Sequence, residues 1–365
     1  MLLYILELII IFVAAVLGAM RTTHARLWYL GIVFTVLFLV SGLRGVSVGS
    51  DTLTYSFEFY QIANNPDLFT ALSRASITAP IYVAYNWVIG QFTQNYQVIL
   101  LINAAVISLG VARLIYKTSS NVPFSAFCFI GLAAYFQSMN GMRQYIAVVI
   151  AINAYLYFAE YGYKSIRGWI LFLLAVGVHP TALVLLLAIV GVFYIRSKDD
   201  SKKAIRILAV ASIACLLLID PLVNLFVSVF PYFAIFQDGS KYDILGQDGS
   251  GRIVLLYVFL AIIVILAYFK LGNEKLSYER EPAAFLFPVV MLAVVLGFAF
   301  SKSFLMNRMV WFFIIGFVPF IPYAFKKYSP SSRTLMGLVT VAVLLAWCFM
   351  QLFENKSAVV PYVLG

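Results

Sequence analysis

The sequence predicts an all-α protein that crosses a membrane many times. Of its 365 residues, 63% are hydrophobic and only 11% are charged, and the mean hydropathy is +0.97. A soluble chain carries about 25% charged residues, so this chain has too little polar surface to face water. It contains repeated apolar runs of about 18 residues or more, which are typical of membrane-spanning helices. The alternating pattern of a transmembrane barrel is absent.

The apolar runs define about twelve expected transmembrane helices in order along the chain. The two runs on either side of His179 are short, and we expect them to form one hairpin over residues 168–195. The runs are residues 2–20, 27–43, 95–114, 121–139, 144–161, 168–178, 180–195, 205–219, 253–269, 283–300, 309–325 and 334–353.

A shorter run, residues 80–93, follows Pro80. Its length as a helix is only about 21 Å at 1.5 Å per residue, which is less than the roughly 30 Å of a bilayer core. We therefore expect a re-entrant or interfacial helix there. The sequence shows no soluble domain or linker, so we expect one polytopic membrane domain over residues 1–365, with outer loops at about 44–79 and 220–251.

The lysines and arginines predict which loops face the cytoplasm. With the N-terminus outside, 17 of the 25 basic residues fall in inner segments, and the densest group lies at 196–206. This bias fits the positive-inside rule and accounts for the net charge of +10 without a nucleic-acid partner. The basic residues left on the outer face are Arg44, Arg74, Arg143, Lys241, Arg252, Lys302, Arg308 and Lys356.

The first outer loop, LRGVSVGSDTLTYSFEFY, contains Arg44, Asp51 and Tyr55. Arg44 ends the second predicted helix. Asp51 is expected to cap a short helix by accepting hydrogen bonds from its free N–H groups. Asp51 and Tyr55 are four residues apart and share a face of that helix. A capped surface helix with no further role would show the same pattern.

The block MNGMRQYIA places Asn140 and Gly141 in a turn before a helix that begins near Arg143. A helix N-terminus carries partial positive charge and free N–H donors, so it favours an anion. Arg143 and Gln144 add to that preference, although an arginine there is unfavourable for the helix itself. The alternative is that Arg143 anchors the helix in the lipid headgroups.

His179, in VGVHPTALV, precedes Pro180, which breaks or begins a helix. Ionisable residues at membrane depth are rare and usually functional. A histidine serves as a general base or as a cation toward phosphate. The alternative is a histidine that only bonds a backbone carbonyl. No second histidine, cysteine or acidic residue lies at ligand spacing, so we expect neither a metal nor a cofactor.

Two further outer segments carry cations: a glycine-rich loop precedes Arg252, and one short loop holds Lys302 and Arg308. Arginine forks match phosphate oxygens in a bidentate fashion, and cations stabilise a diphosphate as it leaves. Together the outer residues predict a site for a lipid-linked diphosphate. The expected diphosphate ligands are Arg143 and Arg308, assisted by Arg252 or Arg44, and the expected positioning residues are Asn140, Gln144, Tyr55 and Lys302.

An acceptor hydroxyl would need a base at this site. His179 and Asp51 are the two candidates, and the sequence leaves the choice between them open.

Several of these blocks resemble the EpsG family of bacterial exopolysaccharide polymerases, which belong with the Wzy-type repeat-unit polymerases. The likeness spans about residues 1–330. Its most specific part is MNG-x-RQ-x-x-A, which contains Arg143 and Gln144, followed about 30 residues later by H-x-[ST]-A, which contains His179. Family members often carry an acidic residue just before a P/G-x-Y segment. This chain has Ala79 there. If that acid is catalytic in the family, this chain uses another base or is a divergent member.

The resemblance implies a fold similar to that of GT-C membrane glycosyltransferases and an active site on the outer face of the bacterial cytoplasmic membrane. It implies a substrate, an undecaprenyl-diphosphate-linked oligosaccharide, that is polymerised into exopolysaccharide, capsule or O-antigen. Candidate protein partners are a chain-length regulator and a flippase, beside the lipid bilayer itself.

Other functions remain open at this point. A transporter or flippase for lipid-linked sugars would often show matched broken helices in its two halves, which this sequence lacks. A membrane acyltransferase that modifies glycans would need an acyl donor from the inner side, where the loops are mainly basic. A glycan ligase could use the same general architecture.

Overall fold

The computed structural model describes residues 1–17, 22–75, 78–217, 228, 251–301 and 304–365. Within these ranges, regular structure is helical apart from an antiparallel bridge between Arg44 and Leu364. The all-α prediction is therefore confirmed. The helices are α1 (Leu2–Leu17), α2 (Thr23–Gly42), α3 (Thr52–Ala63), α4 (Leu68–Arg74), α5 (Pro80–Gly90), α6 (Tyr96–Thr118), α7 (Val122–Gly131), α8 (Ala134–Asn140), α9 (Met142–Tyr161), η1 (Gly162–Lys164), α10 (Ile166–Val178), η2 (Pro180–Leu185), α11 (Leu186–Arg196), α12 (Ser201–Leu217), α14 (Arg252–Phe269), η4 (Pro282–Leu286), α15 (Phe287–Ala299), α16 (Phe304–Ile314), α17 (Phe317–Phe325) and α18 (Pro330–Phe353).

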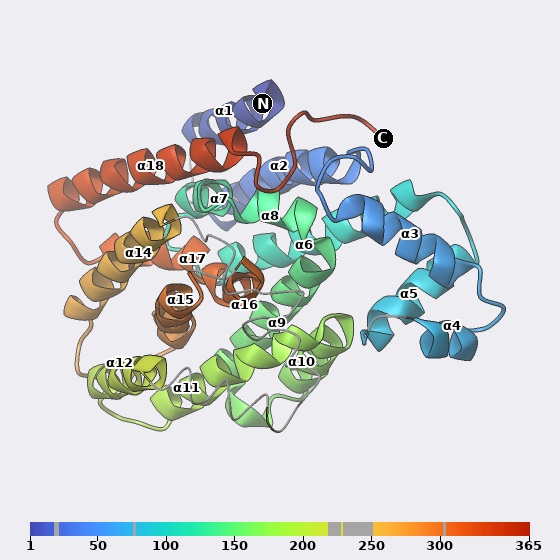
Figure 1. The fold of residues 1–365 in the computed structure, drawn as a ribbon. Coiled ribbons are helices and arrows are strands. Elements are labelled where there is room, and N and C mark those ends of the chain that lie inside the picture. Colours follow the sequence, from blue (N-terminus) through green and yellow to red (C-terminus); the bar gives the residue numbers. More distant parts are fainter. Residues whose placement is uncertain (18–21, 76–77, 218–227, 229–250, 302–303) are drawn as a thin grey trace.

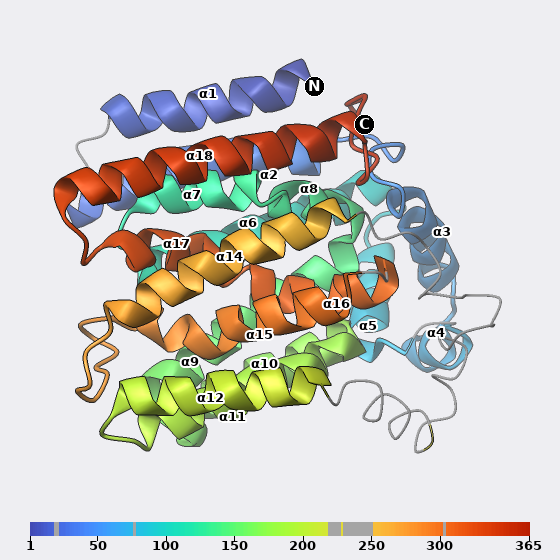
Figure 2. The same cartoon turned by 60° about the vertical axis from the view of Figure 1, so that its left-hand side comes forward.

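The long helices lie side by side in a bundle, and the short helices α3, α4 and α5 form a lobe at one end of it (Figures 1 and 2). Both chain termini lie at the same end as this lobe (Figure 2). We call this end of the bundle the site end. Helix α9 is largely buried because α6, α10, α11 and α16 all pack against it. The start of α9 is therefore held firmly at the site end.

The structure makes the chain a polytopic membrane protein but does not reach the predicted twelve spans. By length and composition, six helices of the described residues could cross a membrane, or eight if each of two bent pairs counts as one span. The apolar helices Leu2–Ala15, Ile166–Val178 and Pro180–Arg196 are shorter. The predicted number of spans was too high, because hydropathy reports apolar residues and does not reveal where a helix ends or bends.

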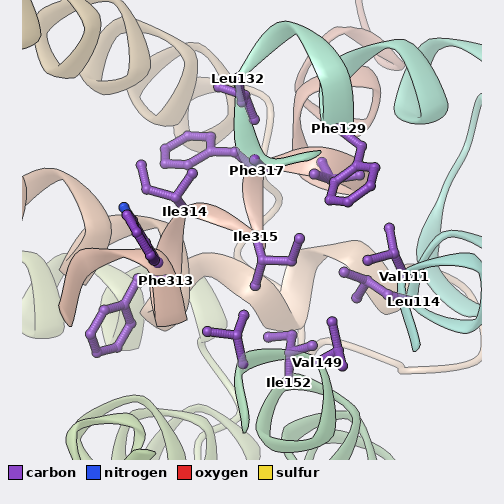
Figure 3. Packing of buried hydrophobic residues seen from close by; sticks show 14 of the residues in the cluster. Val111, Leu114, Phe129, Leu132, Val149, Ile152, Phe313, Ile314, Ile315 and Phe317 are labelled. Atoms are coloured by element: carbon purple, nitrogen blue, oxygen red, sulfur yellow. The ribbon is translucent and has the colours of Figure 1, made fainter. Parts of the chain in front are cut away.

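Two predicted spans are each split by a backbone bend. Helices α7 and α8 meet at 52°, and α16 and α17 meet at 51°. At the first bend, Ala133 has a φ of 60°, a left-handed conformation that ends an α-helix. At the second, a Cβ on Gly316 would lie 2.7 Å from the Val289 side chain. Figure 3 shows Ile315, at this bend, among apolar side chains of α6, α7 and α9. Helix α16 thus starts at the site end and stops in the core.

The run after Pro80 forms α5, which has 11 residues and is not among the candidate spans. Its length is only about 16 Å at 1.5 Å per residue, so the expectation of a short helix is confirmed. It packs against α3, α4 and α10. These contacts attach the lobe to the bundle.

Basic segments assigned to one membrane face by the charge pattern meet at the end of the bundle opposite the site end. Lys275 Nζ lies 3.3 Å from a carboxylate oxygen of Asp199, and the N–H of Leu276 donates to Ser201 Oγ at 2.8 Å. Arg196 donates to the carbonyl of Ala159, near the end of α9. The grouping of the 196–206 and 270–280 segments is therefore matched by tertiary contacts.

Candidate active site

Two ion pairs join the lobe to the bundle at the site end. Asp51, just before α3, pairs with Arg308 of α16, and Glu58 Oε2 lies 3.7 Å from Nη1 of Arg143, near the start of α9. The side chains of Arg143 and Glu58 are each 19% exposed, and those of Arg308 and Asp51 are 20% and 30% exposed. Asp51, Tyr55 and Glu58 follow one another at helical spacing along one face. We call these five residues the arginine cluster.

The Arg143 guanidinium lies over two tyrosine rings. Its central carbon is 5.8 Å from the centre of the Tyr55 ring and 5.3 Å from that of Tyr82. Such contacts attract a cation without using its N–H groups. Among the described residues, Nε and Nη1 of Arg143 are buried and have no hydrogen-bond partner. Buried donors without a partner are costly in a folded protein, so these two atoms favour a ligand that accepts hydrogen bonds.

Arg308 is positioned from both its backbone and its side chain. The Gln144 amide Nε2 donates to the Arg308 carbonyl at 2.8 Å, and the guanidinium lies 5.3 Å from the Trp311 ring. Gly141 permits this arrangement, because a Cβ there would lie 2.6 Å from the Trp311 ring and 3.4 Å from Nη2 of Arg308. The close approach of α9 and α16 therefore requires a residue without a side chain at position 141.

Asn140 holds the loop that precedes α3. Its Oδ1 accepts from the backbone N–H of Asp51 at 3.0 Å and from the Ser50 hydroxyl at 2.9 Å. The prediction that the Asp51 side chain caps α3 is wrong, since it makes no capping hydrogen bond. Its carboxylate accepts instead from Arg308, a charged donor that outcompetes the helix N–H groups.

The C-terminal segment fixes the same loop from its other side. The N–H of Gly45 donates to the Val363 carbonyl and that of Gly49 to the Ala358 carbonyl, both at 2.8 Å. Gly49 has a φ of 95°, and a Cβ there would lie 2.9 Å from the Met139 carbonyl oxygen. The loop is thus tied to two distant parts of the chain before it reaches Asp51.

The cluster shifts the acidity of two lobe residues. Burial raises the pKa of Glu58 above its usual range, the charge of Asp51 adds to this, and the opposing charge of Arg143 partly offsets it. Burial, and then the Asp51 carboxylate, raise the pKa of Tyr55 to about 12. Tyr55 is therefore a protonated donor near neutral pH, while Glu58 takes up a proton more readily than an exposed glutamate.

His179 lies between α10 and η2, and η2 packs against both α9 and α16. Its Nδ1 is 2.6 Å from the hydroxyl of Thr181. The structure therefore places His179 next to an element that packs against the helices of Arg143 and Arg308.

Two predicted diphosphate ligands do not join the cluster. Arg44 is only 1% exposed, and its guanidinium donates to the carbonyls of Val48 at 3.3 Å and Met139 at 2.8 Å and also to Ser41. The Arg252 side chain is 61% exposed and pairs with Glu354, just after α18. Lys302 lies outside the described residues, as does most of the loop at 220–251.

Sequence reasoning missed three members of the site: Glu58, Tyr82 and Trp311. Glu58 had a signal, because it follows Asp51 and Tyr55 at helical spacing along one face. Tyr82 and Trp311 lie in apolar segments and have no polar pattern that would single them out. Only their contacts with Arg143 and Arg308 identify them.

The site therefore combines two arginines with carboxylates, a protonated phenol and a histidine. This set suits an anionic substrate that reacts with a hydroxyl group. The model of the EpsG family matches residues 27–364, which is nearly the whole chain. No significant match to a curated protein or to a solved structure was found. The family match covers every described residue of the site, and the chain belongs to the EpsG family, a family of Wzy-like polymerases.

Proposed function

We propose that this protein is a membrane glycosyltransferase that joins oligosaccharide repeat units carried on undecaprenyl diphosphate into a surface polysaccharide. The EpsG family supports an exopolysaccharide-related polymerase. The observation that carries the proposal is the convergence of Arg143 of α9 and Arg308 of α16 beside carboxylates of the lobe.

The two arginines bind the diphosphate of the donor. Arg143 offers Nε and Nη1, which have no hydrogen-bond partner among the described residues, and a guanidinium fork matches two phosphate oxygens. Arg308 is held beside it by Gln144 and Trp311. As the diphosphate binds, it replaces Glu58 and Asp51 as the counter-charge of the two arginines. The carboxylates are then free to accept protons.

In the chemical step, an acceptor hydroxyl attacks the anomeric carbon of the donor glycan. A base takes the hydroxyl proton, the hydroxyl oxygen forms the new bond to carbon, and the bond from that carbon to the diphosphate oxygen breaks. The diphosphate leaves with the electron pair, and Arg143 and Arg308 stabilise the negative charge that develops on it. Attack from the face opposite the leaving group inverts the anomeric centre.

The structure adds Glu58 to His179 and Asp51 as a candidate base. Asp51 accepts a hydrogen bond from Arg308, and His179 is bonded to Thr181. Glu58 Oε2 is buried and has no hydrogen-bond partner among the described residues, and burial favours its protonated form. A carboxylate with a raised pKa is the stronger base. We therefore assign proton transfer to Glu58 and keep His179 and Asp51 beside the diphosphate.

The cellular setting is part of the same proposal. The charge bias of the loops supports a site end that faces outward from the bacterial cytoplasmic membrane. From the family resemblance we also propose a single polytopic domain with a GT-C-like architecture. The same resemblance suggests a flippase and a chain-length regulator as partners and a product in capsule or O-antigen.

The test replaces Arg143 in the native host and measures polymer and lipid-linked intermediates together. Arg143→Ala should abolish polymer while single lipid-linked repeats persist, and Arg143→Lys should restore only part of the activity because it lacks the fork. Arg26→Ala is the matched control. Arg26 is exposed in the first turn of α2, whereas the loop that leads to Asp51 follows the last turn of that helix. Full-length polymer from Arg143→Ala would refute the proposal.

The same experiment separates a polymerase from a flippase for lipid-linked sugars. Loss of a flippase leaves repeats on the inner leaflet, where an added outer glycosidase cannot reach them. Loss of a polymerase leaves them accessible on the outer leaflet. We expect accessible repeats in the Arg143→Ala strain.

A further inference from the structure

A cavity with a mixed polar and apolar lining lies in the lobe, and Glu58 is one of its lining residues. Its volume is about 330 Å³, and it is lined by Glu58, Gln61, Ile62, Asn65, Ala71, Arg74 and Ala75. This volume is at the lower end of the range of small-ligand sites, about 300–1,000 Å³. The lining comes from α3, α4 and the segments that follow each of them, so the cavity belongs to the lobe seen beside the bundle in Figure 1.

The walls of the cavity are held in place by packing beneath it. Ile62, Ala71 and Val83 form a small buried cluster that joins α3, α4 and α5, and Trp87 packs against it. The indole N–H of Trp87 donates to the Asn65 carbonyl at 3.1 Å. A ligand would therefore meet a largely preformed site.

The chemistry of the lining matches a sugar. Gln61 and Asn65 offer amide donors and acceptors, Arg74 offers a guanidinium fork, and Glu58 offers a carboxylate. Ile62, Ala71 and Ala75 supply a small apolar wall for the C–H face of a ring. Both Gln61 and Arg74 are exposed residues on their helices, so their polar groups can be exchanged from water to ligand hydroxyls at low cost.

The position of Glu58 indicates which of the two substrates, donor or acceptor, would place its sugar in the cavity. The residue lines the cavity and also lies 3.7 Å from Arg143, which holds the diphosphate in the proposed function. A sugar in the cavity would thus present a hydroxyl to Glu58 next to the leaving group. We propose that this cavity is a saccharide subsite for the acceptor repeat unit, with the reactive hydroxyl at Glu58. This inference rests on the proposed function for the identity of the sugar.

The test measures binding of the free repeat oligosaccharide, released by mild acid from the host's lipid-linked repeat units, to the purified full-length protein in lipid nanodiscs. Gln61→Ala and Arg74→Ala should each weaken its affinity about tenfold, as expected for one lost hydrogen bond. Asn64→Ala and Ser73→Ala are the matched controls. They are exposed neighbours in the chain that do not line the cavity, and they should bind as the wild type does.

Arg308→Ala distinguishes this inference from the proposed function. It should slow polymerisation of lipid-linked repeats by about 10²-fold or more and leave the oligosaccharide affinity within about twofold of wild type, because Arg308 does not line the cavity. Wild-type protein that does not bind the oligosaccharide saturably, or cavity variants with unchanged affinity, would overturn the saccharide subsite without touching the polymerase proposal. Binding through the cavity by a wild-type protein that makes no polymer would support the subsite and refute the polymerase.

Discussion

The Asp51 carboxylate accepts a hydrogen bond from Nη2 of Arg308, a residue 257 positions later in the chain. This contact joins the first loop after α2 to α16. Glu58 and Arg143 make a second connection from α3 to α9. The lobe that carries the carboxylates is therefore attached to the bundle through the same arginines that are proposed to hold the substrate. Binding of the diphosphate would weaken both ion pairs at once.

The Asp51–Arg308 pair should behave as a unit in a double-mutant cycle. We expect Arg308→Ala to reduce the polymerisation rate by about 10²-fold or more, as for the loss of one preorganised electrostatic group. Asp51→Asn should reduce it less, and the double variant should be no slower than Arg308→Ala alone. Rates from purified protein with lipid-linked repeats measure the coupling. Additive losses would mean that the two residues act independently.

Arg44 should prove to be a folding residue and not a ligand of the diphosphate. Arg44→Met removes the side-chain donor to the buried carbonyl of Met139, and a buried acceptor without a partner costs about 1–3 kcal/mol. We expect a lower thermal unfolding temperature and a smaller yield of folded protein, with the activity per folded molecule largely kept. A variant of normal stability that has lost its activity would instead return Arg44 to the site.

The pH dependence should report Glu58. Its carboxylate must be ionised to accept a proton, so the rate rises with pH through its pKa. Burial, the largest cause, places this pKa above the usual glutamate value of about 4.3. When the diphosphate engages Arg143, the opposing charge is neutralised, and the acidic limb of kcat should lie at higher pH than that of kcat/KM. The measurement is a pair of pH–rate profiles for wild type and Glu58→Gln. An acidic limb that survives in Glu58→Gln would assign proton transfer to another residue.

Gly141→Ala should disturb the site more than its size suggests. The new Cβ would lie 2.6 Å from the Trp311 ring, which must then shift together with Arg308. We expect about a tenfold or greater loss of polymerisation rate, in line with the sensitivity of catalysis to small displacements. Gly337→Ala in α18 is the matched control, because nothing lies within 4 Å of its Cβ position. Equal rates for Gly141→Ala and wild type would show that α9 and α16 can separate without cost.

The sequence by itself determined the class of the protein and the local positions of several residues of the arginine cluster. The small charged fraction indicated a membrane protein, because so few charged residues cannot cover a soluble surface, and the long apolar runs indicated that it is all-α. The turn at Asn140 and Gly141 placed Arg143 at a helix start, and the helical spacing of Asp51 and Tyr55 placed them on one face. These are local features, and local backbone preferences are enough to predict them.

Only the tertiary structure shows which of the outer arginines lie together at the candidate site. Arg44, Arg143, Arg252 and Arg308 look alike in the sequence, since each lies at the end of an apolar run. In the structure, Arg44 donates hydrogen bonds to backbone carbonyls and Arg252 pairs with Glu354. Arg143 and Arg308 instead form ion pairs with carboxylates of the lobe. The bends that shorten the predicted spans were also hidden, because they depend on the close packing of Gly316 against Val289 and on the backbone of Ala133. The partner of each arginine depends on long-range packing between distant segments, which a local sequence pattern does not reveal.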